Sequence, residues 1–390
     1  MLMDKAPIYL DNNATTSCDP RVVEAMLPYF SSHFGNAASR THLFGWQAEE
    51  SVDLAREQVA ALLGCDKQEI IFTSGATESD NLAIKGVFET YTAKGKHIIT
   101  CVAEHSAVLD TCRHLEKLGA EVTYLPVNHD GLIDIAALEQ AIRPDTILLA
   151  IMFANNETGV LQPIGEIGAI AKKHQVLFFT DATQAVGKIP VDVRKLGIDL
   201  LALSAHKMYG PKGVGALYIR RRDPRVKLVP QLHGGGHERG NRSGTLNVPG
   251  IVGLGKACQL CSDELQQDAT RLSGLRDQLE HALLTVSDSQ VNGANAPRLP
   301  QTTNLSFRQV DSQVMMMGFS AELAISSGSA CSSATLEPSH VLRAMGLTDE
   351  LALSSVRFGL GRFTTQAEID RAIGIITQAV NKLRQAQALS

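Results

Sequence analysis

The sequence is poor in cysteine and has no long apolar run. Seven cysteines among 390 residues are far fewer than a disulfide-stapled extracellular scaffold carries. Because seven is odd, at least one thiol has no partner within the chain. The longest unbroken apolar run covers only residues 147–154, whereas a membrane-spanning helix needs about twenty residues. These shortages exclude a disulfide scaffold and argue against a helical membrane protein.

The chain also lacks an excess of positive charge and a recognisable export signal. Its 36 Lys and Arg residues against 41 Asp and Glu residues give a formal net charge of −5, so no basic footprint indicates nucleic-acid binding. The first residues, MLMDKAPIYLD, contain an acid at Asp4 and no apolar segment of the signal-peptide kind. We therefore expect a cytoplasmic protein with reduced cysteines and with no nucleic-acid or membrane partner.

What the sequence does contain is an alternation of short β-rich runs and helical patterns. At about 150 residues per domain, its length predicts two to three domains. Several β-rich runs are apolar throughout, as in a parallel sheet whose two faces are covered by helices. The alternation therefore predicts an α/β fold with a mainly parallel seven-stranded sheet. The strand runs are residues 69–73, 97–102, 121–125, 146–153, 176–180, 199–204 and 215–219, and the helical patterns include 78–91, 107–118 and 164–174.

The pattern changes near residue 250. A long helical stretch is followed by a loop-rich segment, a strand, a short helix, a further strand and a C-terminal helix near residues 366–388. We therefore expect a large domain over residues 15–255. Residues 1–14 and 256–390 are expected to form a smaller α+β domain.

Polar residues follow five of these strand runs, and ligands of open α/β sheets bind beyond the carboxyl ends of the strands. After the first run, Gly75 permits a tight turn, Thr77 is a good N-cap and Asp80 stands three residues further on. The free N–H groups of such a helix start suit a phosphate, although a capped helix without a ligand explains the same residues. The other four runs are followed by Glu104 and His105, by residues 155–159, by residues 181–184, and by His206 and Lys207.

Lys207 and Asp181 have the most specific chemistry in this set. Lys207 follows a strand that we expect to be buried, and desolvation favours the free amine that forms a Schiff base with an aldehyde. Asp181 could pair with a pyridinium nitrogen. A phosphate site, a lysine and an acid together are what pyridoxal 5′-phosphate (PLP) requires.

Two further residues in the second half of the chain carry open alternatives. Cys331 lies in SSGSACSSA, among small polar neighbours, which favours a reactive thiol on a loop over a packed structural one. Arg357 could bind a substrate carboxylate bidentately or form a surface salt bridge.

Cys258 and Cys261 form a CxxC pair on a predicted helix, but no second pair follows at zinc-site spacing, so packing is favoured over a metal site.

With these residues, the chain resembles cysteine desulfurases of the NifS/IscS type, which are PLP-dependent fold-type-I enzymes of the class-V aminotransferase family. The resemblance runs from YLDNNATT (9–16) to FTT (363–365) and includes the long SSGSAC loop of one group within the family. Its most specific motifs are FTSGATESDN (72–81), EH (104–105), NNETG (155–159), DATQ (181–184), SAHKMYGPKG (204–213), GGGHERGNRSGT (234–245) and SSGSACSSATLEPSHVLRAMG (326–346).

The resemblance implies roles for individual residues. Lys207 would bind PLP covalently, Asp181 would pair with its ring nitrogen, Gln184 would bond its ring hydroxyl, and His105 would stack on the ring and handle protons. The phosphate would be held by Ala76, Thr77, Ser204 and His206, and by Thr245 of the partner subunit in a homodimer. Asn156, also counted with the cofactor site, and Arg357 would hold the substrate carboxylate. Cys331 would accept the sulfur.

The resemblance also implies a reaction. L-cysteine would become L-alanine, and a persulfide on Cys331 would pass sulfur to an acceptor protein such as an iron–sulfur scaffold. No resident metal is implied, although Cys331 could transiently ligate a nascent iron–sulfur cluster. The chain ends at Ser390, short of the extension of housekeeping members, so acceptor and pathway stay open. Another fold-type-I enzyme, a selenocysteine lyase or a small-amino-acid transaminase, is the alternative, and a non-enzymatic sulfur-relay subunit is a third interpretation.

Overall fold

The centre of the protein is a seven-stranded sheet in the order β2-β8-β7-β6-β5-β3-β4. The computed structural model describes residues 7–327 and 337–388, with side chains up to Gln387. Only β8 runs antiparallel to its neighbours, β2 and β7, so the predicted mainly parallel α/β sheet is confirmed. The strands are β2 (Ile70–Thr73), β3 (His97–Cys101), β4 (Glu121–Leu125), β5 (Thr146–Ala150), β6 (Leu177–Asp181), β7 (Leu200–Ser204) and β8 (Gly215–Ile219).

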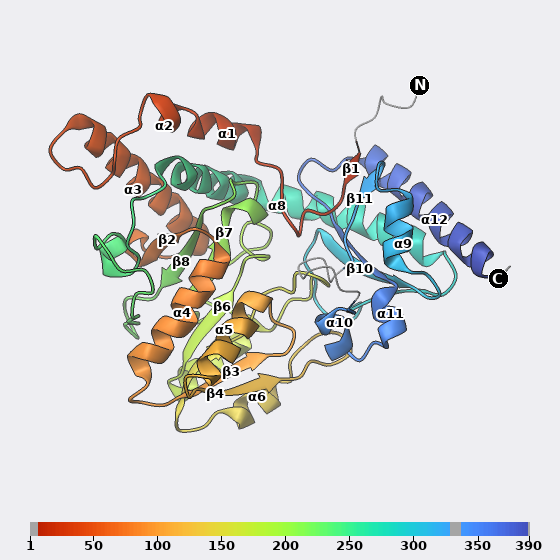
Figure 1. The fold of residues 1–390 in the computed structure, drawn as a ribbon, viewed down its shortest axis with the longest axis horizontal. Helices are drawn as coiled ribbons and strands as arrows, with labels where there is room; N and C mark the ends of the chain where they lie inside the picture. Colours follow the sequence, from red (N-terminus) through yellow and green to blue (C-terminus); the bar gives the residue numbers. More distant parts are fainter. Residues whose placement is uncertain (1–6, 328–336, 389–390) are drawn as a thin grey trace.

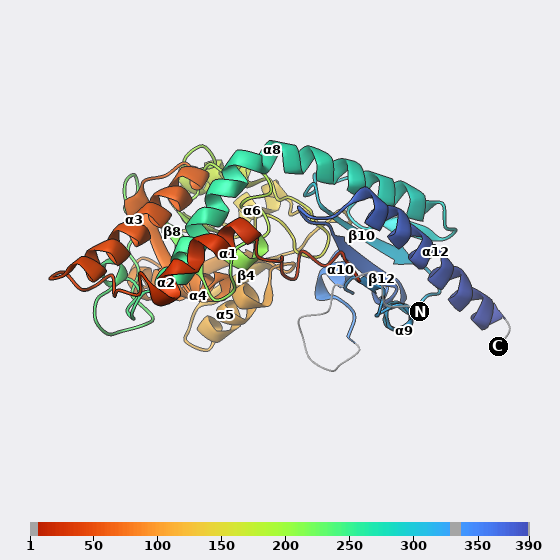
Figure 2. The same ribbon diagram turned by 90° about the horizontal axis from the view of Figure 1, so that it is seen from above.

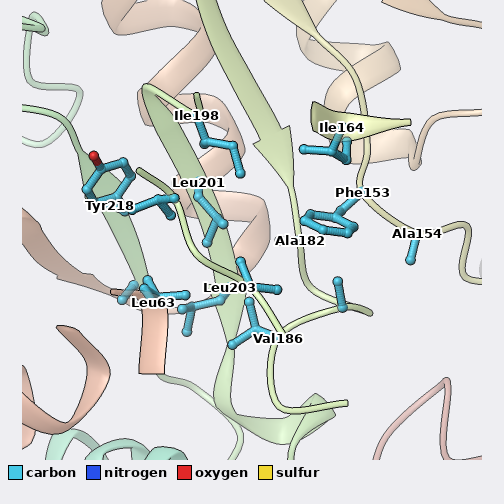
Figure 3. Packing of buried hydrophobic residues seen from close by; sticks show 14 of the residues in the cluster. Leu63, Phe153, Ala154, Ile164, Ala182, Val186, Ile198, Leu201, Leu203 and Tyr218 are labelled. Carbon is cyan, nitrogen blue, oxygen red and sulfur yellow. The ribbon is translucent and has the colours of Figure 1, made fainter. Parts of the chain in front are cut away.

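Apolar side chains alternate between the two faces of this sheet, and helices cover both. Leu201 and Leu203 of β7 pack on the face covered by α3 (Leu43–Leu63), α7 (Ile164–His174) and the start of α8. Figure 3 shows this packing around Leu201, Leu203 and Val186. Leu200 and Ala202 point to the other face, under α4 (Ala76–Tyr91) and α5 (Ser106–Glu116). Burial on both faces explains why the strand sequences are apolar throughout.

The remainder of the chain forms a smaller antiparallel sheet with its own apolar core. This sheet has the order β12-β10-β9 and is packed by α8, α9 and α12. Ile8 and Leu10 belong to this core, and β1 pairs with β11, so the N-terminal segment lies against the C-terminal part of the chain (Figure 1). The elements are β1 (Ile8–Tyr9), β9 (Ser289–Val291), β10 (Thr302–Phe307), α9 (Ser312–Gly318), β11 (Leu323–Ala324), α10 (His340–Ala344), α11 (Asp349–Leu353), β12 (Ser355–Gly359) and α12 (Gln366–Ala388).

A single helix, α8 (Val248–Leu284), runs along both parts of the molecule (Figures 1 and 2). The boundary expected near residue 255 therefore falls inside a continuous helix, and the division into two domains stays a prediction. The remaining elements lie before, between or after the strands of the large sheet along the chain. They are α1 (Pro20–Met26), α2 (Pro28–Ser31), η1 (Lys67–Glu69), α6 (Ile135–Ala141), η2 (Ala205–Lys207) and η3 (Glu238–Gly240).

Two local predictions were wrong. The helix after β2 begins at Ala76 with Gly75 as its N-cap and no side-chain cap, so Thr77 lies inside the first turn, and Asp80 is fully buried instead of capping. The strand predicted over 146–153 ends at Ala150. Beyond it the N–H groups of Ile151 and Phe153 still donate to carbonyl oxygens of β6, but the N–H of Met152 donates to the Glu104 carboxylate, 2.6 Å away.

None of the helices in the described part of the chain combines the length and the apolar character that crossing a membrane requires.

Candidate active site

A cavity of about 550 Å³ lies at the carboxyl ends of the central strands. Residues that are far apart in the sequence meet around it, as expected for ligand sites of open α/β sheets. From the large sheet they include the residues after β2, β3, β5, β6 and β7, and from the smaller sheet they include Arg357 of β12. Ten of the residues singled out from the sequence line it: Ala76, Thr77, His105, Asn156, Asp181, Gln184, Ser204, His206, Lys207 and Arg357.

Lys207 reaches this cavity from the short helix η2, directly after β7. Its Nζ donates to the carbonyl oxygens of Asn13 and Ala14, at 2.6 and 2.8 Å. Both carbonyls belong to the N-terminal segment, which β1 attaches to the smaller sheet. The amine is therefore held in one position by backbone oxygens before any ligand binds.

One end of the cavity suits an anion. Helix α4 begins there at Ala76 without a side-chain cap, so its first N–H groups, which have no partner within the helix, face the cavity. The turn before α4 packs closely against the start of β8. Gly215 permits this contact, because a Cβ there would come within 2.7 Å of the Gly75 Cα. Thr77, Ser204 and His206 line the same cavity.

His206 is neutral at physiological pH. Burial, followed by the charges of Lys207, Lys212 and Lys188, lowers the pKa of His206 to about 4. Its Nδ1 lies 3.1 Å from the Thr15 hydroxyl. The imidazole can therefore offer an N–H donor to an anion without itself carrying a charge.

Asp181 and Gln184 follow one another around the turn after β6. The Asp181 side chain is 7% exposed, and its Oδ1 accepts a hydrogen bond from the Thr183 N–H at 2.9 Å. The Thr183 hydroxyl is buried beside the cavity and has no hydrogen-bond partner among the described residues. Gln184 donates from Nε2 to the Asn13 carbonyl oxygen at 2.9 Å. The turn thus presents a carboxylate, a hydroxyl and an amide to one ligand.

His105 is the N-cap of α5, and its orientation follows from that position. Its Nδ1 accepts a hydrogen bond from the Ala107 N–H at 3.1 Å. A neutral imidazole whose Nδ1 accepts carries its hydrogen on Nε2. The cap therefore assigns proton exchange with a ligand in the cavity to Nε2.

Arg357 is a buried cation of the cavity wall, 3% exposed. Its Nη2 donates to Asp11 Oδ1 at 2.7 Å and its Nη1 to the Asn156 carbonyl oxygen at 3.1 Å, while its buried Nε has no partner among the described residues. Asn155 orders the adjoining loop by accepting from the N–H groups of Glu157 and Thr158. Arg357 therefore retains capacity for a ligand carboxylate.

These residues fit PLP. The uncapped start of α4 with Thr77, Ser204 and His206 suits a phosphate, and the Asp181 carboxylate suits a pyridinium nitrogen. Lys207 supplies an amine for the aldehyde, and the unpartnered Thr183 hydroxyl and Arg357 Nε lie where a polar ligand would satisfy them.

Two of the predicted residues are not part of this cavity as described. Thr245 is exposed and is not among the residues that line it. Cys331 lies outside the described residues. Cys258 and Cys261 are buried on α8, where burial raises the pKa of each thiol, and the described part of the chain contains no group of three or more His, Cys, Asp or Glu side chains placed to hold a metal ion.

Sequence reasoning missed four contributors. Asn13 and Thr183 stood inside quoted motifs, so the motifs could have identified them. Arg242 bonds Glu78 at the start of α4, from Nε to Oε1 at 2.7 Å, and it too lies in a quoted motif. Lys188 is buried and donates to Gln184, and nothing in its local sequence indicates this.

The chain is similar to known proteins over nearly its whole length. The model of the family described as "Aminotransferase class-V" matches residues 8–372. The chain is 56% identical, over 99% of its length and 95% of the relative's, to a protein named cysteine desulfurase IscS from Anaeromyxobacter dehalogenans. A solved NifS-like protein superposes with a TM-score of 0.88 at 38% identity, covering 96% of this chain and 99% of the other. The structure titled "SspA in complex with cysteine" gives 0.80 at 39% identity, covering 92% and 100%.

Proposed function

The chain belongs to the class-V aminotransferase family as a PLP-dependent cysteine desulfurase of the NifS/IscS type, and on that premise we propose roles for the residues around its cavity. The observation that supports these roles is the convergence of Lys207, Asp181, His105 and Arg357 on one cavity. Lys207 would bind PLP covalently through Nζ. Asp181 would pair with the ring nitrogen of PLP, and Gln184 would bond the ring hydroxyl. When bound, PLP supplies an electron-withdrawing ring that stabilises negative charge at the substrate α-carbon.

The remaining residues bind L-cysteine and move its protons. Arg357, with Asn156, holds the carboxylate. The Lys207 amine would remove the α-proton at Nζ. His105 exchanges the proton of the substrate thiol at Nε2. Arg357 is buried and the other three residues are half-buried, which limits the access of bulk water to these hydrogen bonds.

Cys331 accepts the sulfur. Its thiolate forms an S–S bond with the substrate sulfur, and the substrate Cβ–S bond breaks. The products are a persulfide on Cys331 and L-alanine, and the proton lost by the Cys331 thiol balances the one added to the β-carbon. We propose that the persulfide supplies an acceptor protein of iron–sulfur cluster assembly, in the cytoplasm, where thiols stay reduced.

The enzyme works as a homodimer in this proposal. Large apolar side chains of α1, α2, α3 and the loop between α2 and α3 are exposed, including Phe34 and Phe44, whose ring centroids lie 5.3 Å apart. Exposed apolar surface of this kind favours a protein interface. Thr245 is exposed, so it is available to reach the phosphate in the partner's cavity. Residues 15–255 form the PLP-binding domain, and residues 1–14 with 256–390 form the domain that carries Cys331.

Two variants test these roles together. Lys207→Ala is expected to lose the visible absorbance band of bound PLP. Cys331→Ala is expected to keep the band and lose the release of sulfide and alanine. Full turnover by Cys331→Ala would overturn its role as the acceptor. Pyruvate with an aminated acceptor, in place of alanine, would instead identify a transaminase.

Subunit mixing tests the shared site. Thr245→Ala and Lys207→Ala subunits are mixed and allowed to exchange. In the hybrid dimer, the cavity with an intact Lys207 receives an intact Thr245 from the other chain. We expect PLP affinity in that cavity to return to the parent value, and a hybrid that binds no better than the Thr245→Ala homodimer would contradict the arrangement.

A further inference from the structure

Lys188 is a buried lysine that the proposed reaction does not use. It lies four residues after Gln184, and its side chain is 8% exposed. Its Nζ donates to Gln184 Oε1 at 2.7 Å. Because an ammonium group without a partner is expensive to bury, this contact is significant for the placement of both side chains.

The contact determines which way the Gln184 amide faces. Lys188 Nζ donates to the oxygen of this amide, and in its charged form it can only donate, so it selects the oxygen end. The nitrogen end then faces Asn13, to whose carbonyl oxygen Nε2 donates at 2.9 Å. An amide nitrogen has two N–H groups, and Gln184 lines the cavity, so the second is available to an acceptor there. A flipped amide would set two oxygens, those of Gln184 and Asn13, against each other.

The same carbonyl connects this arrangement to Lys207. The Asn13 oxygen accepts from Lys207 Nζ at 2.6 Å as well as from Gln184. One hydrogen-bonded series therefore runs from Lys188 through Gln184 and Asn13 to Lys207. We propose that Lys188 is a positioning residue, which orients the Gln184 amide as a donor to the cofactor ring hydroxyl and acts through Asn13 on the amine of Lys207.

Charge reinforces the connection between the two lysines. Burial, followed by the charge of Lys207, lowers the pKa of Lys188 to about 7. The Cys261 thiol of α8 acts in the opposite direction, and Arg357 of β12 adds to the lowering. Since electrostatic coupling is reciprocal, a charged Lys188 favours the neutral amine of Lys207, the form that reacts with an aldehyde.

A double-mutant cycle tests the proposal, which rests on the proposed cofactor role of Lys207. The equilibrium dissociation constant of PLP is measured for the parent, Lys188→Met, Gln184→Leu and the double variant. Lys188→Met is expected to weaken PLP binding about three- to tenfold, the size of one ordinary hydrogen bond. In the Gln184→Leu background the same change should matter less than about twofold. Effects that simply multiply would show that Lys188 acts independently of Gln184.

Two further variants separate positioning from folding. Lys188→Gln keeps an N–H donor without the charge, so it should bind PLP more tightly than Lys188→Met, and equal losses would overturn the orienting role. Lys173→Met removes an exposed lysine that pairs with Glu139 and should bind PLP as the parent does. Thermal unfolding of each apoprotein checks that it folds. If Lys188→Met does not fold, Lys188→Gln replaces it in the double-mutant cycle with Gln184→Leu.

The pH dependence of the PLP absorbance band gives a readout that a packing defect would not move. Both Lys188→Met and Lys188→Gln should shift the pH midpoint of the absorbance change to higher pH, because the positive charge of Lys188 near Lys207 is removed. Unshifted transitions would contradict the coupling between the lysines. A parent protein that binds no PLP would instead contradict the proposed function itself, so the two failures are distinguishable.

Discussion

Arg357 and Asp11 form an ion pair beside the cavity, with Nη2 and Oδ1 2.7 Å apart and the arginine side chain only 3% exposed. The pair joins β12 to the N-terminal segment, which also supplies the carbonyl oxygens that hold Lys207. A buried arginine with one carboxylate partner, whose buried Nε has no partner in the described part of the chain, is prepared for a second carboxylate. This arrangement supports the assignment of the substrate site to Arg357.

Replacing Arg357 should weaken substrate binding more than cofactor binding. A hydrogen bond to a charged group contributes about 1.5–3 kcal/mol, so Arg357→Gln is expected to raise KM for L-cysteine at least tenfold while PLP affinity changes less than about twofold. Steady-state kinetics and PLP titration measure the two effects. Arg343→Gln, which removes an exposed partner of Asp349, is the control and should leave KM unchanged. An unchanged KM in Arg357→Gln would place the carboxylate elsewhere.

Glu157 should make the stability of the apoprotein depend on pH. Burial raises its pKa from 4.5 to about 7, although the Ser339 hydroxyl, 2.5 Å from Oε2, and the charge of Arg357 act to lower it. Between these two values the folded protein keeps a proton that the unfolded chain releases. The free energy of unfolding contributed by Glu157 is therefore fully present below about pH 4.5 and falls as the pH rises to about 7.

Glu157→Gln removes this dependence, because the amide mimics the protonated acid. Relative to the parent, the variant should gain on the order of 2 kcal/mol in free energy of unfolding between about pH 5 and pH 8. Urea unfolding of the two apoproteins measures the difference. Glu139→Gln serves as the control, since ion pairs with Lys173 and His174 lower the pKa of this exposed carboxyl and no such gain is expected. Parallel pH profiles for Glu157→Gln and the parent would show that Glu157 is ionised in the folded protein.

The buried ion pair between Arg56 and Glu238 should matter for folding. The guanidinium of Arg56, on α3, bonds both carboxylate oxygens of Glu238 at 2.7 and 2.8 Å, and Glu238 also accepts from the Phe72 N–H of β2. Removing one member leaves an uncompensated buried charge, so Arg56→Met is expected to cost about 3–5 kcal/mol in the free energy of unfolding.

The control for Arg56→Met is an exposed pair nearby. Lys67→Met removes the partner of Glu57, where both side chains are exposed, and such pairs contribute at most about 1 kcal/mol. Denaturant unfolding measures both variants. Equal effects in the two would mean that burial adds nothing to the Arg56 pair.

The sequence predicted the central sheet well because its strands are buried on both faces. Residues 147–150 and 200–203 are apolar throughout, and the strands that contain them are fully buried. The end of β5 was placed three residues too late, because Ile151, Met152 and Phe153 are just as apolar and buried as the strand itself. The Met152 N–H bonds the Glu104 carboxylate in place of a backbone partner, and this contact joins segments that follow two different strands, β5 and β3.

Site residues were predictable where the side chain itself has a recognisable chemistry. They were not predictable where a backbone group, or a side chain that acts through another residue, makes the contact. Lys207, Asp181 and Arg357 have side chains whose chemistry could be named in advance. The carbonyl oxygens of Asn13 and Ala14 hold Lys207, but a carbonyl has no sequence signature. Lys188 reaches Gln184 only after the turn beyond β6 folds. The N-cap at Gly75 was missed because this residue packs closely against Gly215, and a contact between distant segments has no local sequence signal.

The central claim is that the residues around the cavity transfer sulfur from L-cysteine to Cys331. The most direct measurement is mass spectrometry of the peptide that contains Cys331, after the PLP-loaded protein has reacted with L-cysteine under alkylating conditions that preserve persulfides. The account predicts one added sulfur atom on Cys331 in the parent protein, formed together with L-alanine, and none in Lys207→Ala. An added sulfur on Cys331 in Lys207→Ala, or alanine formed by the parent while Cys331 stays unmodified throughout turnover, would contradict it.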